Sequence, residues 1–385
     1  MFNEKRFKDL FERRGNHLVS VFIPTYRANH SQEDRLRLKN ALLEASRQLE
    51  EHGFQKQEAR AYLEKAFELL ENQRFFTELS DGLCLFVGED FFSWEVLPVN
   101  FNPYVFVGNR FYLRPVLPVL TGQSRFFLLA LSQNEVRFFE GHQHSITPVR
   151  IDDLVPGSME EMFEMSDVKE HLQHHSGQGA RRGKQGSREA VYHGQASGKD
   201  DHKDDIKKYF KEIDRGLMEM LYDETPPMVI AAVDYLVPLY REVNRYPHLL
   251  DENVSGNPEG EGPVALHERA WAIIGRYYRE KQEEKKTSFR EAMAQDKASA
   301  GLTEIIPAAI NGRVEALYVN KDYHTYGLFD EEKNSITIHE KRRPNSQELL
   351  GMAAVMAYLQ GGAVQILERE DMPVPASNIN AVFRY

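Results

Sequence analysis

Two Gly-Gln pairs, Gly177-Gln178 and Gly194-Gln195, lie within a polar stretch, residues 174–201, near the middle of the chain. Glycine lets the backbone approach another molecule closely, and the glutamine amide both donates and accepts hydrogen bonds. Such a pair can hold a water molecule beside an ester carbonyl. It cannot act as a strong general base, because an amide does not titrate near neutral pH. The pattern therefore favours hydrolysis through the positioning of water.

The same stretch is basic in an otherwise acidic chain. Residues 171–199 hold five cations and one acid, a local excess of +4, whereas the whole chain carries a net charge of −11, which leaves −15 on the remainder. The cations are Arg181, Arg182, Lys184, Arg188 and Lys199. Affinity for nucleic acids comes largely from such side chains neutralising phosphates, so we predict a local RNA contact rather than a general nucleic-acid coat. A solvated charged loop is the alternative that this composition leaves open.

A flexible linker is the simplest interpretation of a stretch rich in Gly and Ser. A linker should fall between cores, however, and this stretch interrupts what reads as one α/β unit. Long loops without secondary structure are uncommon inside a domain and are often functional. We therefore interpret residues 166–203 as a functional loop.

Other chemistries are weaker. Two of His171, His174 and His175 have the i, i+4 spacing of helical metal ligands, but no carboxylate or thiolate completes the set. The acids of residues 199–205 suit the start of a helix better than a cation site. Cys84 is the single cysteine, and its apolar setting predicts a buried packing role. We expect no metal and no cofactor.

The elements that position the loop follow from hydrophobic periodicity. Residues 1–122 predict an N-terminal α/β domain, with a strand over 18–25, helices in 33–76 and strands in 82–98 and 104–120. Residues 123–284 predict a middle α/β domain, in which a helix begins at Asp204 and Asp205, directly after the loop. Residues 285–385 predict a C-terminal α/β domain with a helix capped by Ser346 and ended by Gly361 and Gly362.

The order of several segments resembles a known superfamily. These segments are LVSVFIPT, DGLCLFVGED, VGNRFYLRPVL, DDIKKYFKEIDRGL, PPMVIAAVDYLVPLYREV, LLGMAAVMAYLQGGAVQILE and INAVFRY. Together they resemble the archaeo-eukaryotic peptide-chain release factor and Pelota superfamily, and more narrowly its bacterial branch, the bacterial archaeo-eukaryotic release factor-like proteins. The resemblance rests on the order of these segments over the whole chain.

The resemblance implies a fold and a site. It implies a ribonuclease-H-like middle domain, whose loop carries Gly-Gly-Gln into the peptidyl-transferase centre, and a C-terminal domain like the kink-turn-binding ribosomal proteins. The motif falls best on Gly194 and Gln195, just before the long helix, with Gly177 and Gln178 as the competing register. Neither register is a literal Gly-Gly-Gln, because His193 or Ser176 takes the place of the first glycine.

The function that the resemblance implies is release or rescue on the ribosome by hydrolysis of the peptidyl-tRNA ester. The Asn-Ile-Lys-Ser stretch that reads stop codons is absent from the sequence, and of the Tyr-x-Cys motif only the cysteine is kept, so we expect no stop-codon decoding. Two alternatives stay open, a non-catalytic tRNA-shaped factor that binds the ribosome or RNA and, more remotely, a metal-dependent nuclease.

The resemblance implies the ribosome and peptidyl-tRNA as partners, and it leaves open whether a partner GTPase takes part. We expect no membrane partner and a cytoplasmic protein, because no leader precedes residue 17 and no apolar run approaches the length that spans a bilayer.

Overall fold

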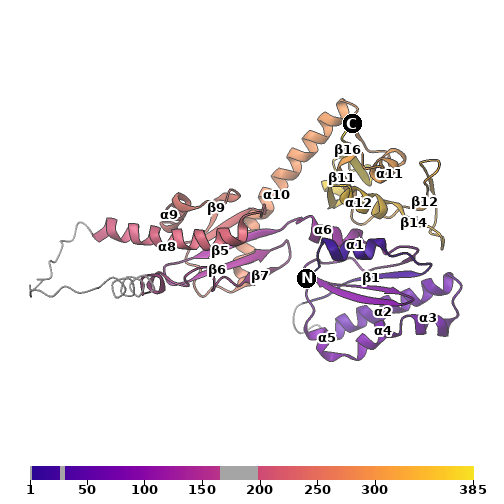
Figure 1. Cartoon of the computed structure of the whole chain (residues 1–385), viewed down its shortest axis with the longest axis horizontal. Coiled ribbons are helices and arrows are strands. Elements are labelled where there is room, and N and C mark those ends of the chain that lie inside the picture. Colours follow the sequence, from indigo (N-terminus) through magenta and orange to yellow (C-terminus); the bar gives the residue numbers. More distant parts are fainter. Residues whose placement is uncertain (1, 27–30, 165–197) are drawn as a thin grey trace, which may run out of the picture. The chain divides into compact units, whose positions relative to one another are not determined.

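The computed structural model describes residues 2–26, 31–164 and 198–385, of which residues 198–201 are described by their backbone alone. The fold is mixed α/β with four sheets among these residues (Figure 1). Contacts within the chain define two compact units. Unit 1 comprises Met1–Gln123 and Tyr278–Tyr385, and unit 2 comprises Ser124–Tyr277. The predicted division into three domains is a different grouping and stays a prediction.

Unit 2 is built on a five-stranded sheet of order β7-β6-β5-β8-β9. Its strands are β5 (Phe126–Leu131), β6 (Val136–Gly141), β7 (Ile146–Val149), β8 (Met228–Ala232) and β9 (Leu249–Ser255). The first three strands form an antiparallel meander, and β8 runs parallel to both β5 and β9. The predicted strands at β5, β6 and β8 are confirmed, whereas β7 and β9 were not predicted.

Helices cover both faces of this sheet, because successive side chains of a strand point to opposite faces. Phe127 belongs to the core that contains α8 (Gly198–Leu221) and α9 (Leu236–Val243). Its neighbour Phe126 instead meets the ring of Trp271 in α10 (Pro263–Ala294) at 6.0 Å. The central strand β5 is consequently buried on both sides.

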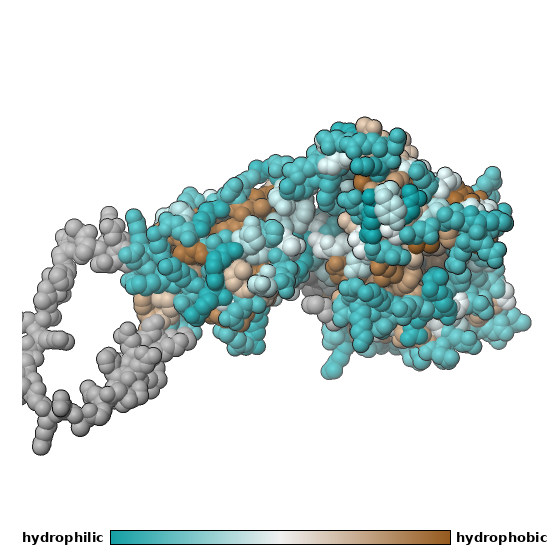
Figure 2. Space-filling view, turned by 45° about the horizontal axis from the view of Figure 1, so that its top comes forward, coloured by the Kyte–Doolittle hydropathy of each residue, from teal (hydrophilic) through white to brown (hydrophobic). Residues whose placement is uncertain are grey.

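The face in Figure 2 is mostly hydrophilic, and its apolar atoms form separate patches. No helix in the described part of the chain has both the length and the apolar character that a bilayer crossing requires.

The N-terminal part of unit 1 is an antiparallel sheet of order β3-β2-β1-β4. Its strands are β1 (Leu18–Pro24), β2 (Gly82–Gly88), β3 (Phe91–Leu97) and β4 (Tyr104–Gly108). One face packs on the helices α2 (Ser31–Glu51), α3 (Lys56–Tyr62), α4 (Glu64–Glu68) and α5 (Gln73–Thr77). The other face contacts α1 (Glu4–Glu12) and the C-terminal part of the unit. The predicted strand at β1 and the predicted β2–β3 turn are confirmed.

The C-terminal part of unit 1 holds two small sheets, β10-β16-β11-β15 and β13-β12-β14. The first contains β10 (Ala298–Ser299), β11 (Val314–Asn320), β15 (Ala363–Leu367) and β16 (Ile379–Phe383). The second contains β12 (Tyr326–Asp330), β13 (Ser335–Ile338) and β14 (Gln347–Glu348). Helices α11 (Leu302–Ile310) and α12 (Leu349–Leu359) complete this part of the unit.

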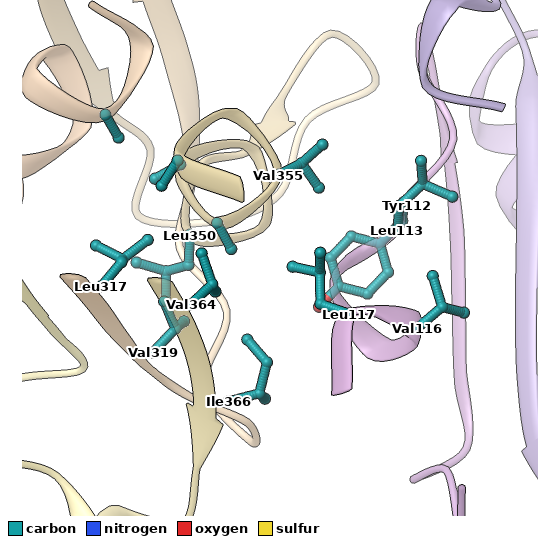
Figure 3. Close-up of a cluster of buried hydrophobic side chains, with 14 of the residues drawn as sticks. Tyr112, Leu113, Val116, Leu117, Leu317, Val319, Leu350, Val355, Val364 and Ile366 are labelled. Carbon is teal, nitrogen blue, oxygen red and sulfur yellow. The ribbon is translucent and has the colours of Figure 1, made fainter. Parts of the chain in front are cut away.

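The two parts of unit 1 share one hydrophobic core. Leu117, in the short helix α6 (Leu117–Leu120), belongs to the same buried cluster as Val355 in α12 and Val364 and Ile366 in β15. Figure 3 shows these side chains in the space between α12, β15 and the segment around α6. Unit 1 is therefore assembled from segments at opposite ends of the sequence.

Two predictions about local structure were wrong. The strand expected over 104–120 ends at Gly108, and the 3-10 turn η2 (Arg114–Val116) and α6 follow, because Pro115 and Pro118 suit the first turn of a helix. The expected Ser346 cap is replaced by Glu348, whose carboxylate accepts from Gly351 N at 2.6 Å. Ser346 instead bonds to His339 Nδ1 at 2.7 Å. The predicted end of this helix is confirmed at Gly361, which has φ +75.

Candidate functional site

The predicted catalytic pair lies outside the described residues. So do Gly177, Gln178 and four of the cations, which are Arg181, Arg182, Lys184 and Arg188, together with His171, His174 and His175. The fifth cation, Lys199, lies in the first turn of α8, where only the backbone is described. The structure therefore describes the two segments that lead into and out of the loop, and it does not place Gly194 or Gln195.

Helix α8 is the segment that leaves the loop. It begins at Gly198, so the start expected at Asp204 was wrong and residues 198–203 of the predicted loop are helical. Acids at positions 200 and 201 explain the earlier start, since acids in a first turn favour a helix. At about 1.5 Å per residue, the helix of 24 residues is about 36 Å long.

Only the later part of α8 packs on the sheet. Its buried large apolar side chains recur at helical spacing, whereas residues 202–204 are exposed. These side chains are Ile206, Tyr209, Phe210, Ile213, Leu217 and Leu221. About 12 Å of helix therefore precedes the first of these buried side chains. In Figure 1 the N-terminal end of α8 extends beyond the strands of the sheet. The loop consequently joins a helix that projects from its core.

The segment that enters the loop also ends in a helical turn, over residues 159–164. Ser158 Oγ accepts a hydrogen bond from Glu161 N at 3.1 Å, and Glu161 Oε2 accepts one from Gly157 N at 2.7 Å. Ser-x-x-Glu is the sequence signature of such a helix start. Both segments next to the gap are thus helical.

These two segments are held together by close backbone packing. Gly216 of α8 lies against Leu154, and a Cβ atom built on Gly216 would stand 2.1 Å from Leu154 O. Tyr209 donates its hydroxyl hydrogen to Gly157 O at 3.4 Å. The entering segment is also tied to the β5–β6 turn, because Met159 N donates to Gln133 O at 2.9 Å. We call this set of contacts the loop clamp.

A buried carboxylate anchors α8 on its other side. Asp214 is 2% exposed and accepts from Arg245 N at 3.0 Å and from Arg245 Nε at 2.6 Å. Arg245 follows α9, so this pair joins α8 to the connection between α9 and β9. The carboxylate therefore has one backbone donor and one charge-assisted donor, which satisfy its hydrogen bonding in the buried position. The pair fixes the position of the helix.

No cluster of metal-binding side chains is present among the described residues around the loop clamp. Among residues 2–26, 31–164 and 198–385, no three His, Cys, Asp or Glu side chains are grouped so that they could hold a metal ion. Cys84 is buried in β2, and burial raises the pKa of its thiol, which confirms the predicted packing role. The contacts of the loop clamp support positioning of the two segments that flank the loop.

The sequence reasoning missed the positioning residues. The sequence patterns assign no role to Gly216, Asp214 or Tyr209. A signal was present at Gly216, because a glycine inside a helical pattern costs stability unless packing or function requires it. Asp214 offered a second one, since a carboxylate next to a buried helix face needs a partner.

Unit 2 is thus an α/β layer structure in which a long polar stretch of sequence connects the helical turn at residues 159–164 to α8. Residues 126–276, which include most of this unit, match the model of bacterial archaeo-eukaryotic release factor family 7. The match confirms the predicted resemblance to this family of release-factor-like proteins. It covers less than half of the chain and includes the loop, the loop clamp and the five-stranded sheet.

Among solved structures, the chain is similar to aRF1, Pelota and Dom34. The archaeal translation termination factor aRF1 shares 12% identity, with 99% of this chain and 96% of that chain covered and a TM-score of 0.24. Pelota from Archaeoglobus fulgidus shares 12% identity, with 79% of each chain covered and a TM-score of 0.27. The S. cerevisiae translation termination-like factor Dom34 shares 11% identity, with 79% and 74% covered and a TM-score of 0.36. Similarity at this level carries no functional argument. No curated protein matches the chain.

Proposed function

We propose that the protein is a ribosome-associated release or rescue factor that promotes hydrolysis of the peptidyl-tRNA ester without decoding stop codons. The observation that carries the proposal is the match of residues 126–276 to a release factor family, because these residues span the Gly-Gln loop. The loop clamp supports it. A loop that must deliver one amide to a buried reaction centre needs a base that does not shift, and even small displacements slow such reactions.

In the proposed mechanism the loop supplies position and hydrogen bonds. Gly194 lets the backbone approach the ester, and Gln195 orients the attacking water. Stabilisation of the developing charge by fixed dipoles contributes most of the rate enhancement. Arg181, Arg182, Lys184, Arg188 and Lys199 neutralise RNA phosphates around the loop. Gly177 and Gln178 remain the competing register.

The finer features of fold and partners belong to the same proposal. Unit 2 is taken as a ribonuclease-H-like domain and residues 285–385 as a domain like the kink-turn-binding ribosomal proteins. The ribosome and peptidyl-tRNA are the proposed partners in the cytoplasm. Pelota has been described bound to the ribosome, and Dom34 as interacting with Hbs1. A partner GTPase is an extension of the proposal.

The first test is release of labelled peptide from stalled ribosome–peptidyl-tRNA complexes. Gln195→Ala should lower the release rate by about a hundredfold or more, a loss typical of removing one positioned hydrogen-bonding group, and should leave ribosome binding unchanged. Gln178→Ala is the matched control in the same loop and should release at the wild-type rate. If Gln178→Ala alone loses activity, the register is the other one. Equal rates in all three proteins would refute the catalytic assignment.

A non-catalytic role is favoured by one observation. His193 stands where a literal Gly-Gly-Gln has its first glycine, and a side chain there restricts both backbone conformation and approach. In that case wild-type protein binds ribosomes and releases no peptide, and substitution of Arg181, Arg182 and Arg188 weakens binding and its salt dependence. The nuclease alternative gains no support from the described residues.

A further inference from the structure

Three arginines of unit 1 gather where α1 ends. Arg13 and Arg14 follow the last residue of α1, and Arg110 follows β4. The hydrogen bond from Gly15 N to Asn109 O, at 3.4 Å, joins these two stretches of chain. Arg13 and Arg14 are exposed, and Arg110 is half-buried. We call Arg13, Arg14 and Arg110 the arginine patch.

The guanidinium groups of the patch are held in place by aromatic rings. Arg13 lies over the ring of Phe91, with its Cζ 3.7 Å from the ring centroid. Arg14 and Arg110 both lie over Phe11, at 5.4 and 5.3 Å. A ring under a guanidinium fixes its plane and leaves the N–H groups at its edge free for a ligand. The patch is therefore preorganised to bind oxyanions such as phosphate through the N–H groups at the guanidinium edges.

Charge compensation within the patch is incomplete. In the part of the chain that the structure describes, none of the three arginines forms an ion pair, and no acceptor contacts the guanidinium N–H groups of Arg13 or Arg110. Arg14 donates to two carbonyl groups at the end of α1, including Arg13 O at 2.9 Å. Burial and the neighbouring charge of Arg14 lower the pKa of Arg110, although the group stays charged. The exposed acids Glu12 and Glu331 act on the patch only at longer range.

The surroundings of the patch limit the kind of partner. A cavity of about 50 Å³ adjoins it, lined by Phe11, Asn109 and Arg110 among others, and this volume holds water but not a nucleobase. Phe11 and Phe91 are not among the exposed large apolar side chains, so the patch lacks the apolar anchors of a membrane-binding surface. Several separate guanidinium groups suit a ligand with repeated phosphates.

We infer that the arginine patch binds the phosphate backbone of single-stranded RNA, at a site in unit 1 that is separate from the Gly-Gln loop. The choice of RNA among polyanions rests on the proposed function, because it is the release factor match that links the chain to RNA. Contact with the backbone carries no base specificity. The site contributes affinity and orientation, and ester hydrolysis is not part of it.

The test measures binding of the full chain to a fluorescein-labelled single-stranded RNA of about 20 nucleotides, a length that spans several phosphate contacts. Arg181, Arg182 and Arg188 are first replaced by alanine, so that the loop does not mask the result. In this background Arg13→Ala, Arg14→Ala and Arg110→Ala together should weaken binding at least about tenfold at 0.1 M salt. The slope of log K against log salt should fall by about 2, at ~0.7 for each phosphate contact.

The matched control is Arg60→Ala. Arg60 is exposed and lies over Phe67 with its Cζ 3.5 Å from the ring centroid, so this variant removes the same charge and the same kind of ring contact elsewhere in unit 1. It should leave affinity and slope unchanged. Arg13→Ala alone, at an exposed position where folding is not at risk, should lower the slope by about 0.7.

Unchanged RNA affinity and slope in the triple variant would overturn the inference. If the same variant also loses binding to phosphatidylserine vesicles, the patch is a membrane contact instead. Because the assay needs neither ribosomes nor release, its failure is separate from failure of the proposed function. A protein that lacks release activity and still shows the expected slopes would keep the inference.

Discussion

At the scale of single residues, the clearest electrostatic feature is the carboxylate of Glu140 at the end of the β5–β6 hairpin. His142 Nε2 lies 3.6 Å from Glu140 Oε1, and Arg125 donates to both carboxylate oxygens at 2.9 and 3.1 Å. Arg125 also donates to Glu224 Oε2 at 2.5 Å. Against burial, which raises it, the bonds from His142 and Arg125 lower the pKa of Glu140 to about 2.

This shift predicts a pH dependence of stability. A carboxylate whose pKa is lower in the folded than in the unfolded chain stabilises the fold above its unfolded pKa, and the contribution is lost as pH falls through the folded pKa. For Glu140 the loss should occur between about pH 4.5 and pH 2. We expect about 1 kcal/mol, because solvent screens a carboxylate that is 34% exposed.

Urea unfolding of wild type and Glu140→Gln at pH 6, 4 and 2.5 checks this. The variant should be less stable at pH 6, and the difference should shrink towards pH 2.5. Glu4→Gln is the control. Glu4 forms an exposed ion pair with Lys8, so this change should alter stability little at any of these pH values. If the difference in unfolding free energy between wild type and Glu140→Gln is the same at all three pH values, the charge of the carboxylate does not contribute.

At the scale of elements, the loop clamp depends on the close approach of α8 to the segment before the loop. The contact of Gly216 with Leu154 and Val155 leaves no room for a side chain. The neighbouring bonds from Tyr209 and Met159 add directionality to this contact. A helix that moved away from Leu154 would carry the loop with it, because the loop continues directly into α8.

Gly216→Ala tests the clamp. Alanine favours a helix by about 1 kcal/mol over glycine, but its Cβ would overlap Leu154 O, so we expect a net loss of about 1–3 kcal/mol in the free energy of unfolding. Gly262→Ala is the control, because a Cβ there meets nothing within 4 Å. If the proposed function holds, Gly216→Ala should also lower release while ribosome binding persists. A stabilised Gly216→Ala protein would contradict the packing described above.

The sequence predicted the elements better than their contacts. β1, β2 and the β5–β6 pair are runs of apolar and β-branched residues, and such runs specify a strand locally. β9 was missed because Asp251, Glu252 and Asn253 make it polar, and it is a strand only because β8 pairs with it. The helix start at Gly198 was misplaced because Gly and Lys do not mark a cap. The sequence thus predicted the strands that local side-chain preferences specify, and it missed the strand that depends on its neighbour.

For the candidate site too, the sequence predicted local features and missed contacts between distant residues. The Gly-Gln pairs and the surrounding cations could be found from composition alone, since their chemistry does not depend on distant residues. The contact of Gly216 with Leu154 and the bond from Arg245 to Asp214 join positions far apart in the chain. The arginine patch likewise combines residues 13–14 with residue 110. Such juxtapositions follow from the sheet order, which no single segment encodes.

At the scale of the whole molecule, the two units differ in how their cores are assembled. The main hydrophobic cluster of unit 2 comes from residues 127–246, and α10 covers the other face of its sheet through Trp271 and its buried neighbours. The shared core of unit 1 combines residues 2–117 with residues 305–383. Buried charges join its parts as well, since Arg114 Nη1 lies 3.7 Å from Glu348 Oε2 and each side chain is 1% exposed. The core of unit 1 is therefore complete only when the N-terminal and C-terminal segments of the sequence are both present.

Fragments of the chain should reveal this difference. Residues 124–277 alone should fold cooperatively, because their core is complete, whereas residues 1–123 alone should expose half of the shared core and bind a hydrophobic dye. Thermal unfolding followed by circular dichroism, with dye binding and limited proteolysis, distinguishes the two. Mixing residues 1–123 with residues 278–385 should suppress dye binding. A stable, dye-free fragment 1–123 would show that its own helices suffice.

The insertion of unit 2 between Gln123 and Tyr278 has a consequence for biosynthesis. Residues 1–123 leave the ribosome long before the segment that completes their core. At ~5–20 residues per second, the remaining chain takes roughly ten to fifty seconds to make. Unit 2 is complete once residue 277 has been made, so it can fold within that interval. Apolar side chains of residues 1–123, such as Phe22 and Leu117, still lack their partners at that stage. We therefore expect the nascent protein to need chaperones chiefly for residues 1–123, because these residues are made before the segment that completes their core.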